Sequence, residues 1–288
     1  FHRYGPWAMN TVGLDGETLP PGEIGLDALW AGWVSMPGRL DERGRVVVAE
    51  PGVLEEMRAL GYRGASTEWN WNGWGGGIDT LFRREASLAQ ALGAAGYLNA
   101  LIRQSDSFAI ANQSMLLGHR WGISGIMTSL DSEHPPFIQP TAWATVLYAR
   151  HHGAQRVTAA VVESPRATPI RVQLGRHKMF PQIAWQDVVA TRDADTLYVH
   201  AINRHRARPA ELTLDVAAYA PYFSAARVHR LEAKPADQGV TTRDAARLVT
   251  LGLDVAPAPE LTLDLPPATV SVFEFDLIAA GENTARSH

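Results

Sequence analysis

The sequence predicts an α/β region followed by an all-β region. In residues 1–153, short apolar runs alternate with segments of helical periodicity, which indicates βα units on a parallel sheet. Beyond Gly153, short alternating runs are separated by proline, glycine and aspartate, which is typical of an antiparallel β-sandwich. The chain has 288 residues, enough for both parts. We therefore predict two domains, residues 1–153 and 154–278, with a boundary near 153–156.

The α/β region begins with a strand end, a loop-rich stretch and a helix–strand unit. Residues 1–4 resemble the end of a buried strand, as though the chain continued from a longer one, and residues 10–50 are rich in breakers around a short helix at 27–34. A helix is predicted over 51–60, because Pro51 favours the first helical turn and Gly61 follows the last. Residues 62–67 then predict a buried parallel strand that ends at Glu68.

The strongest helix signal covers residues 79–105. Leucine and alanine recur there near helical spacing, and Thr80 is placed to cap the start. Residues 108–111 form another short apolar run and predict the next strand. A second helix is predicted over 141–152, because Gly153 provides the stop.

Seven short runs predict the strands of the sandwich: 157–162, 196–203, 210–216, 226–231, 246–251, 261–265 and 269–277. The closing strand is the clearest of them, because its apolar residues follow the break at Pro266-Pro267. Residues 279–288 form a tail whose end resembles a vector scar, so we exclude it from the fold.

Composition excludes several function classes. The formal net charge is −4 and the pI is about 6.2, which argues against a nucleic-acid partner. No apolar run approaches the length of a membrane span, so no membrane partner is expected. The chain contains no cysteine, which removes disulfides, thiolate catalysis and cysteine-ligated zinc.

One short segment, residues 66–74, points to carbohydrate chemistry. It contains a carboxylate, three tryptophans and two asparagines: Glu68, Trp69, Trp71, Trp74, Asn70 and Asn72. Tryptophan faces stack on sugar rings, asparagine amides bond sugar hydroxyls, and a glutamate in that setting suits a glycosidase nucleophile or acid. The alternative is a surface glutamate that lies beside core tryptophans.

No metal or cofactor is predicted. His200 and His205 have no carboxylate at ligand spacing, and the pair His151-His152 ends a helix, where imidazolium suits the helix dipole. Gly75-Gly76-Gly77 lacks the lysine and hydroxyl of a phosphate-binding loop, so a flexible rim is expected there.

Four pieces of the sequence together resemble the family 51 α-L-arabinofuranosidases of the clan A glycoside hydrolases. Phe1-His2-Arg3-Tyr4 is similar to the family's His-x-Tyr at the end of barrel strand six, and Thr67-Glu68-Trp69-Asn70 to its Asp-Glu-Trp-Asn at the end of strand seven. The helix through residues 95–103 and the closing run 265–272 occur in the family's order. The chain departs from the family at Thr67, where an acidic residue is usual, and at Pro140, next to the expected substrate-contacting Gln139.

This resemblance implies strands six to eight of a (β/α)₈ barrel, followed by a jelly-roll-like sandwich. It implies a retaining mechanism with Glu68 as nucleophile and with His2 and Tyr4 beside it. The residues expected around the substrate are Trp69, Asn70, Trp71, Trp74, Trp121 and Gln139. The family's acid/base glutamate would lie upstream of Phe1, so we expect the isolated chain to be inactive.

Three other interpretations stay open at this point. One is another clan A glycosidase, such as a β-xylosidase or an endoglucanase; the second is a non-catalytic carbohydrate-binding protein; the third is a structural sandwich in which Glu68 only packs. The resemblance implies an arabinose-containing glycan as substrate and a homo-oligomer, and it leaves a cytoplasmic or secreted location open.

Overall fold

The structure is a computed structural model. It describes the following residues: 2–5, 9–11, 26–34, 39–40, 46–47, 51–71, 87–118, 124–128, 135–159, 161–167, 172–174, 177–179, 183–219, 223–235 and 245–278. In this part of the chain no helix is both long enough and apolar enough to span a bilayer.

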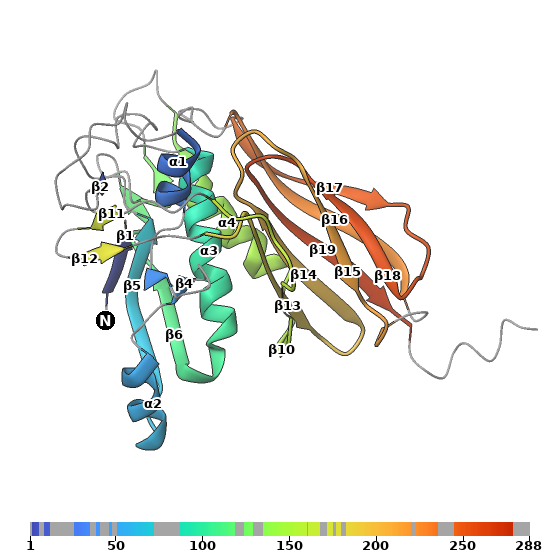
Figure 1. The fold of residues 1–288 in the computed structure, drawn as a ribbon, viewed down its shortest axis with the longest axis horizontal. Helices are drawn as coiled ribbons and strands as arrows, with labels where there is room; N and C mark the ends of the chain where they lie inside the picture. Colours follow the sequence, from blue (N-terminus) through green and yellow to red (C-terminus); the bar gives the residue numbers. More distant parts are fainter. Residues whose placement is uncertain are drawn as a thin grey trace, which may run out of the picture.

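The α/β region contains a three-stranded parallel sheet. Its strands are β1 (His2–Gly5), β5 (Gly64–Trp71) and β6 (Phe108–Gln113), in the order β1-β5-β6. Helix α2 (Pro51–Ala59) precedes β5, as the sequence predicts. The described residues do not form a closed eight-stranded barrel. Figure 1 shows the three strands side by side, and the helix that connects β5 to β6 in the sequence packs against them.

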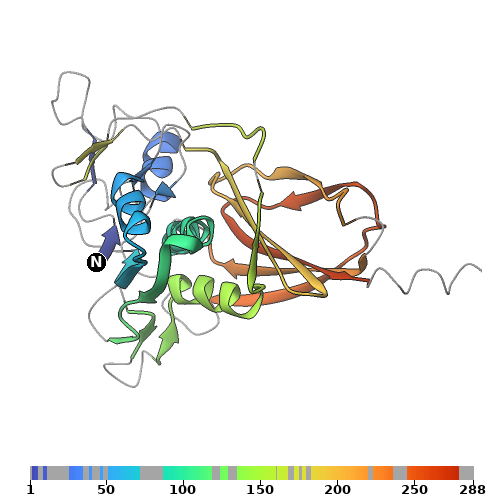
Figure 2. The same ribbon diagram turned by 90° about the horizontal axis from the view of Figure 1, so that it is seen from below.

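That helix, α3 (Leu88–Arg103), is the central element of the molecule. All but a few of its residues are buried, because the parallel sheet covers one side and the sandwich the other (Figure 2). It begins after Ser87, whose backbone N–H donates to the side chain of Gln90 over 3.2 Å. The predicted cap at Thr80 lies outside the described residues, and the helix starts later than its predicted first residue, 79.

Smaller elements surround this sheet. They are α1 (Leu26–Val34), β2 (Met9–Thr11), β3 (Arg39–Leu40), β4 (Val46–Val47), a 3₁₀ turn (Ser105–Ser107), β7 (Leu117–Gly118), β8 (Ile126–Met127), β9 (Phe137–Ile138), β11 (Val172–Leu174) and β12 (His177–Met179). The predicted helix at 27–34 is confirmed as α1. The predicted helix at 141–152 is α4 (Pro140–Arg150), which starts at a proline and is followed by His151 as its C-cap.

The second region is an antiparallel sandwich, as predicted. Six strands form the larger sheet in the order β10-β13-β14-β19-β16-β17: β10 (Gln155–Val157), β13 (Gln186–Arg192), β14 (Thr196–Asn203), β19 (Thr269–Leu277), β16 (Phe223–Ala233) and β17 (Ala246–Leu253). The smaller sheet pairs β15 (Ala210–Asp215) with β18 (Glu260–Leu265). The sequence missed β13, and the strand predicted at 157–162 shares only Val157 with β10.

The larger sheet is covered on both faces. Alternate side chains of β19 point to opposite faces of this sheet. Phe273 and Phe275 face β15 and β18, whereas Val270 and Val272 face the helices. Helices α3 and α4 therefore lie between the parallel sheet and the sandwich, and both views place them there (Figures 1 and 2). The two regions share one apolar core across this junction.

A buried charge cluster also holds the junction together. Asp187 at the start of β13 forms ion pairs with Arg103 at the end of α3 and with Arg204 after β14. The side chains of Asp187 and Arg204 are 7% and 2% exposed. A buried carboxylate requires such partners, because its desolvation is costly.

We expect Gly153→Ala to destabilise the protein by about 3 kcal/mol, since a Cβ there would overpack a site that cannot shift easily. Gly153 links α4 to the sandwich, and an added Cβ would lie 2.1 Å from the backbone carbonyl carbon of Arg192. Gly252→Ala in β17 is the matched control, because a Cβ there meets nothing within 4 Å. Urea denaturation of both variants measures the difference; equal stabilities would contradict the assigned contact.

Candidate functional site

Glu68 lies near the carboxyl end of β5, the central strand of the parallel sheet. The register of β1 and β5 sets His2 opposite Glu68 and Tyr4 opposite Asn70. The Tyr4 hydroxyl donates to Glu68 Oε2 over 2.8 Å, and His2 Nδ1 lies 3.2 Å from the same oxygen. The structure thus brings together the three residues for which the sequence predicts a catalytic role.

An irregularity in β5 directs the Glu68 side chain. Ser66 pairs with Ala111 and Trp69 with Gln113, so three steps along β5 match two along β6. Strand β5 therefore has one residue more than β6 over this interval, which is a β-bulge at Thr67 and Glu68. Such bulges redirect side chains. Because of it, Ser66 and Trp69 both face α3, where each contacts Tyr97, while Glu68 faces away from the helix.

Asn70 fixes the strand just beyond Glu68. Its amide Nδ2 donates to the Ser114 carbonyl over 2.8 Å, and its Oδ1 accepts from Gln113 Nε2 over 3.2 Å and from the Trp71 backbone N–H over 2.8 Å. The residue is fully buried. Asn70 therefore ties β5 to β6 rather than reaching a ligand, which corrects the predicted substrate contact.

The electrostatic setting keeps Tyr4 protonated. Burial raises the pKa of Tyr4, and the hydrogen bond with Glu68 and the charge of that carboxylate raise it further, against a lowering contribution from Ser114. Tyr4 is thus a hydrogen-bond donor at neutral pH. The side chains of Glu68 and His2 are 43% and 56% exposed, so a solvent-borne ligand can reach the carboxylate.

The buried positions of Trp69 and Trp71 contradict their predicted stacking on a sugar. Trp69 is 1% exposed and packs on Tyr97 with ring centroids 4.9 Å apart. Trp71 is 0% exposed and meets Trp33 edge-on at 4.5 Å. The bulge turns both rings into the apolar layer against α3 and α1, so they stabilise the sheet.

Of the remaining predicted substrate contacts, the structure describes Gln139 but not Trp74 or Trp121. Gln139 is the residue before α4; it is 1% exposed, and its Nε2 donates to the Ser124 carbonyl. Its burial contradicts the predicted substrate contact. Trp74 and Trp121 lie outside the described residues. Sequence reasoning also missed Ser114, whose carbonyl holds Asn70, because nothing in the local sequence marks it.

The combination of fold and site defines a class of protein. A parallel sheet that presents a hydrogen-bonded, accessible carboxylate near its strand ends, followed by an antiparallel sandwich, is an arrangement found in glycoside hydrolases. The sequence profile of the α-L-arabinofuranosidase C-terminal domain matches residues 68–268, more than half of the chain. The chain therefore belongs to that family, which confirms the resemblance found in its sequence. No curated protein sequence matches it.

Solved structures share the fold. An arabinofuranosidase superposes with a TM-score of 0.63 at 19% identity, over 77% of this chain and 45% of its own. The α-L-arabinofuranosidase of Thermotoga maritima, in complex with arabinose, superposes with a TM-score of 0.63 at 17% identity, over 78% of this chain and 46% of its own. The thermostable family 51 α-L-arabinofuranosidase of Thermotoga petrophila RKU-1 superposes with a TM-score of 0.63 at 20% identity, over 77% of this chain and 46% of its own. The chain thus spans less than half the length of these proteins.

Proposed function

We propose that this chain is the C-terminal part of a retaining α-L-arabinofuranosidase, with Glu68 as the nucleophile. In this proposal β1, β5 and β6 are the last strands of a (β/α)₈ barrel. The single observation that carries it is the exposed Glu68 carboxylate near the end of β5, held by Tyr4 and His2 from the neighbouring strand. In barrels of this kind, catalytic groups project from the carboxyl ends of the strands.

The proposed reaction proceeds in two displacements. Both hydrogen-bonding contacts are to Glu68 Oε2, so we assign Oε1 as the oxygen that attacks the anomeric carbon. As that bond forms, the bond to the leaving oxygen breaks, and a second carboxyl group protonates the departing alcohol. The same group then takes a proton from water, which attacks the anomeric carbon and releases Glu68 together with the free sugar.

The second carboxyl group belongs, in this proposal, to a part of the enzyme that this chain does not contain. A retaining enzyme needs its two carboxyl groups about 5–5.5 Å apart. The contacts that the described residues make to Glu68 come from a tyrosine and a histidine. The match covers only 45% and 46% of two of the similar structures, which leaves room for the barrel strands that would carry this acid/base.

We expect Tyr4→Phe to lower kcat by about 10–100-fold, since a hydrogen bond to a charged group contributes about 1.5–3 kcal/mol. Tyr4 holds Oε2 while Oε1 reacts, so its loss leaves the attacking carboxylate less well oriented. Tyr62→Phe is the matched control, because Tyr62 is an exposed tyrosine that precedes β5. Steady-state kinetics of the complete enzyme measures the effect; an unchanged kcat would remove Tyr4 from the mechanism.

The test of the function compares aryl glycosides as substrates of the complete enzyme. We expect it to hydrolyse nitrophenyl α-L-arabinofuranoside and to leave nitrophenyl β-D-xyloside intact, with the anomeric configuration retained in the first product by NMR. Faster hydrolysis of the xyloside would favour another clan A glycosidase. Sugar binding without turnover, unchanged by Glu68→Ala, would favour a carbohydrate-binding protein.

A further inference from the structure

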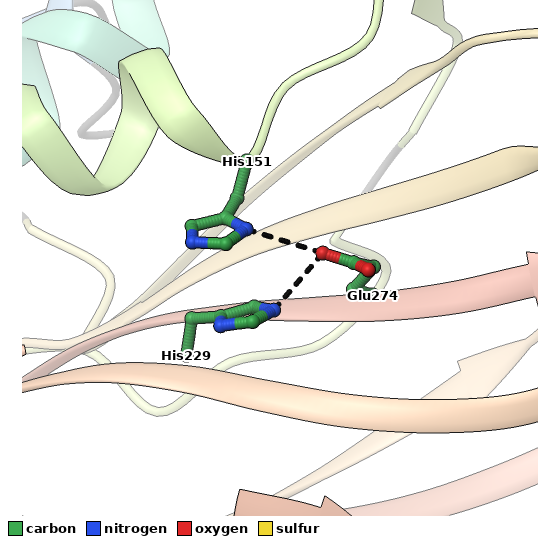
Figure 3. A group of neighbouring side chains, drawn as sticks. All are labelled: His151, His229 and Glu274. Atoms are coloured by element: carbon green, nitrogen blue, oxygen red, sulfur yellow. Dashed lines mark hydrogen bonds and ion pairs between the residues drawn. The ribbon is translucent and has the colours of Figure 1, made fainter. Parts of the chain in front are cut away.

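A cluster of two histidines and a glutamate lies at the junction of α4 and the larger sandwich sheet, away from Glu68. His151 follows the last turn of α4, His229 lies in β16 and Glu274 in β19 (Figure 3). Glu274 shares the helix-facing side of β19 with Val272, two residues earlier, which directs its carboxylate toward the end of α4.

The potential ligand atoms of the three residues lie close together. His151 Nδ1 lies 3.1 Å and His229 Nε2 2.9 Å from Glu274 Oε2, and the ligand atoms of the three residues all lie within 4.8 Å of one another. Ligands of a tetrahedral zinc ion, with bonds of about 2.1 Å, are about 3.4 Å apart. To hold an ion, each nitrogen would move a few tenths of an ångström away from Glu274 Oε2. The two imidazole rings, which stack with centroids 3.5 Å apart and an interplanar angle of 14°, would also tilt so that their in-plane lone pairs point at one ion.

From this geometry we propose that His151, His229 and Glu274 form a binding site for a divalent transition metal, with zinc as the best match. Two imidazoles and a carboxylate are a ligand set that zinc accepts, with water as a fourth ligand. The His151 side chain is 21% exposed and provides a route for the ion, while His229 and Glu274 are 7% and 14% exposed.

The surrounding groups suit the ion in both charge and orientation. Arg227 binds Oε1 of Glu274 and also Asp276, so Oε2 remains directed at the histidines. The carboxylates of Glu274 and Asp276 and the guanidinium of Arg227 together carry one net negative charge, which would lie beside the divalent cation. His229 Nδ1 lies 2.8 Å from the Thr250 hydroxyl, so when Nε2 binds metal the ring proton resides on Nδ1 and is donated to Thr250.

This site departs from the sequence-based expectation that the chain binds no metal. His151 and Glu274 are separated by 123 residues, so no spacing pattern reveals them. The ion would bind α4 to both β16 and β19, and it would therefore stabilise the contact between the helices and the sandwich. The proposal does not depend on the glycosidase function, because none of its residues contacts Glu68.

Zinc titration of the metal-depleted 288-residue chain, prepared without a polyhistidine tag, tests the proposal. Calorimetry is expected to show one Zn²⁺ per chain, and zinc is expected to raise the melting temperature because it binds the folded state. His151→Ala and Glu274→Gln should each weaken binding by at least about 100-fold, since even outer-shell changes cost up to that factor. His151→Ala changes a helix-end residue, so circular dichroism should show an unchanged fold.

His152→Ala is the matched control, because it removes the neighbouring exposed histidine and leaves the cluster intact. It is expected to bind zinc as the unaltered chain does. The proposal is overturned if the unaltered chain binds no zinc, in which case the cluster is a purely hydrogen-bonded clasp between α4 and the sheet. It is equally overturned if His151→Ala and Glu274→Gln bind zinc with undiminished affinity.

Discussion

Replacing Glu68 with alanine in the complete enzyme is expected to lower kcat by about 10⁴-fold or more, the scale seen when a catalytic nucleophile or its activating group is removed. The carboxylate forms the covalent intermediate in the proposed mechanism, and the other groups that contact it, Tyr4 and His2, only orient it. Steady-state hydrolysis of an aryl α-L-arabinofuranoside measures the loss.

A rescue experiment separates a lost nucleophile from a damaged fold. Azide added to the Glu68→Ala variant should attack the anomeric carbon in place of the carboxylate and yield a glycosyl azide of inverted configuration. Glu56→Ala is the matched control, because Glu56 is an exposed glutamate on α2, just before β5. Activity of Glu68→Ala close to that of Glu56→Ala would show that Glu68 is not the nucleophile.

Replacing Asp187 with asparagine is expected to lower the free energy of unfolding by about 3–5 kcal/mol, the cost of removing one partner of a buried ion pair. Arg204, 2% exposed, would keep its charge without a carboxylate, and Arg103 would keep only its hydrogen bond to the Val188 carbonyl of β13. The loss should appear in urea denaturation as a lower midpoint.

Asp106→Asn provides the matched control for Asp187→Asn. Asp106 pairs with Arg156 over 2.7 Å across the same junction, but the two side chains are 64% and 36% exposed. Exposed pairs contribute at most about 1 kcal/mol, so this variant should stay close to the original stability. Equal losses for the two variants would show that burial is not what makes the Asp187 cluster important.

The contribution of Asp187 should also depend on pH. Burial acts to raise its pKa, but the charges of Arg204 and Arg103 outweigh burial and lower the pKa from 3.8 to about 2. Because the folded pKa is the lower one, the stabilisation is present above about pH 4 and is lost as pH falls toward 2. The stability difference between the original chain and Asp187→Asn should shrink over that interval; a constant difference would contradict this assignment.

Much of the fold could be predicted from local sequence patterns. The alternation of apolar residues in β14 and β19 and the helical spacing in α3 predict those elements, because each depends on which face of the element is buried. Strand β13 was missed because polar residues interrupt it: Asp187 lies near its start, and Thr191 and Arg192 lie at its end. Neither alternation nor an unbroken apolar run therefore marks it.

The candidate site could be predicted only in part. Family resemblance pointed to Glu68, Tyr4 and His2, and the structure brings them together. The burial of Trp69 and Trp71 could not be predicted, because it results from a bulge that depends on the pairing of β5 with β6, some 45 residues later in the chain. Composition alone cannot tell a tryptophan that stacks on sugar from one that packs on a helix.

The role of Glu68 as nucleophile is tested most directly by the intact mass of the complete enzyme after incubation with a mechanism-based arabinofuranosyl inhibitor, followed by peptide mapping. We expect one covalent glycosyl adduct, located on Glu68 and absent from the Glu68→Ala variant. An adduct on a different carboxylate, or reversible sugar binding with no adduct, would contradict the assignment of Glu68 as the nucleophile.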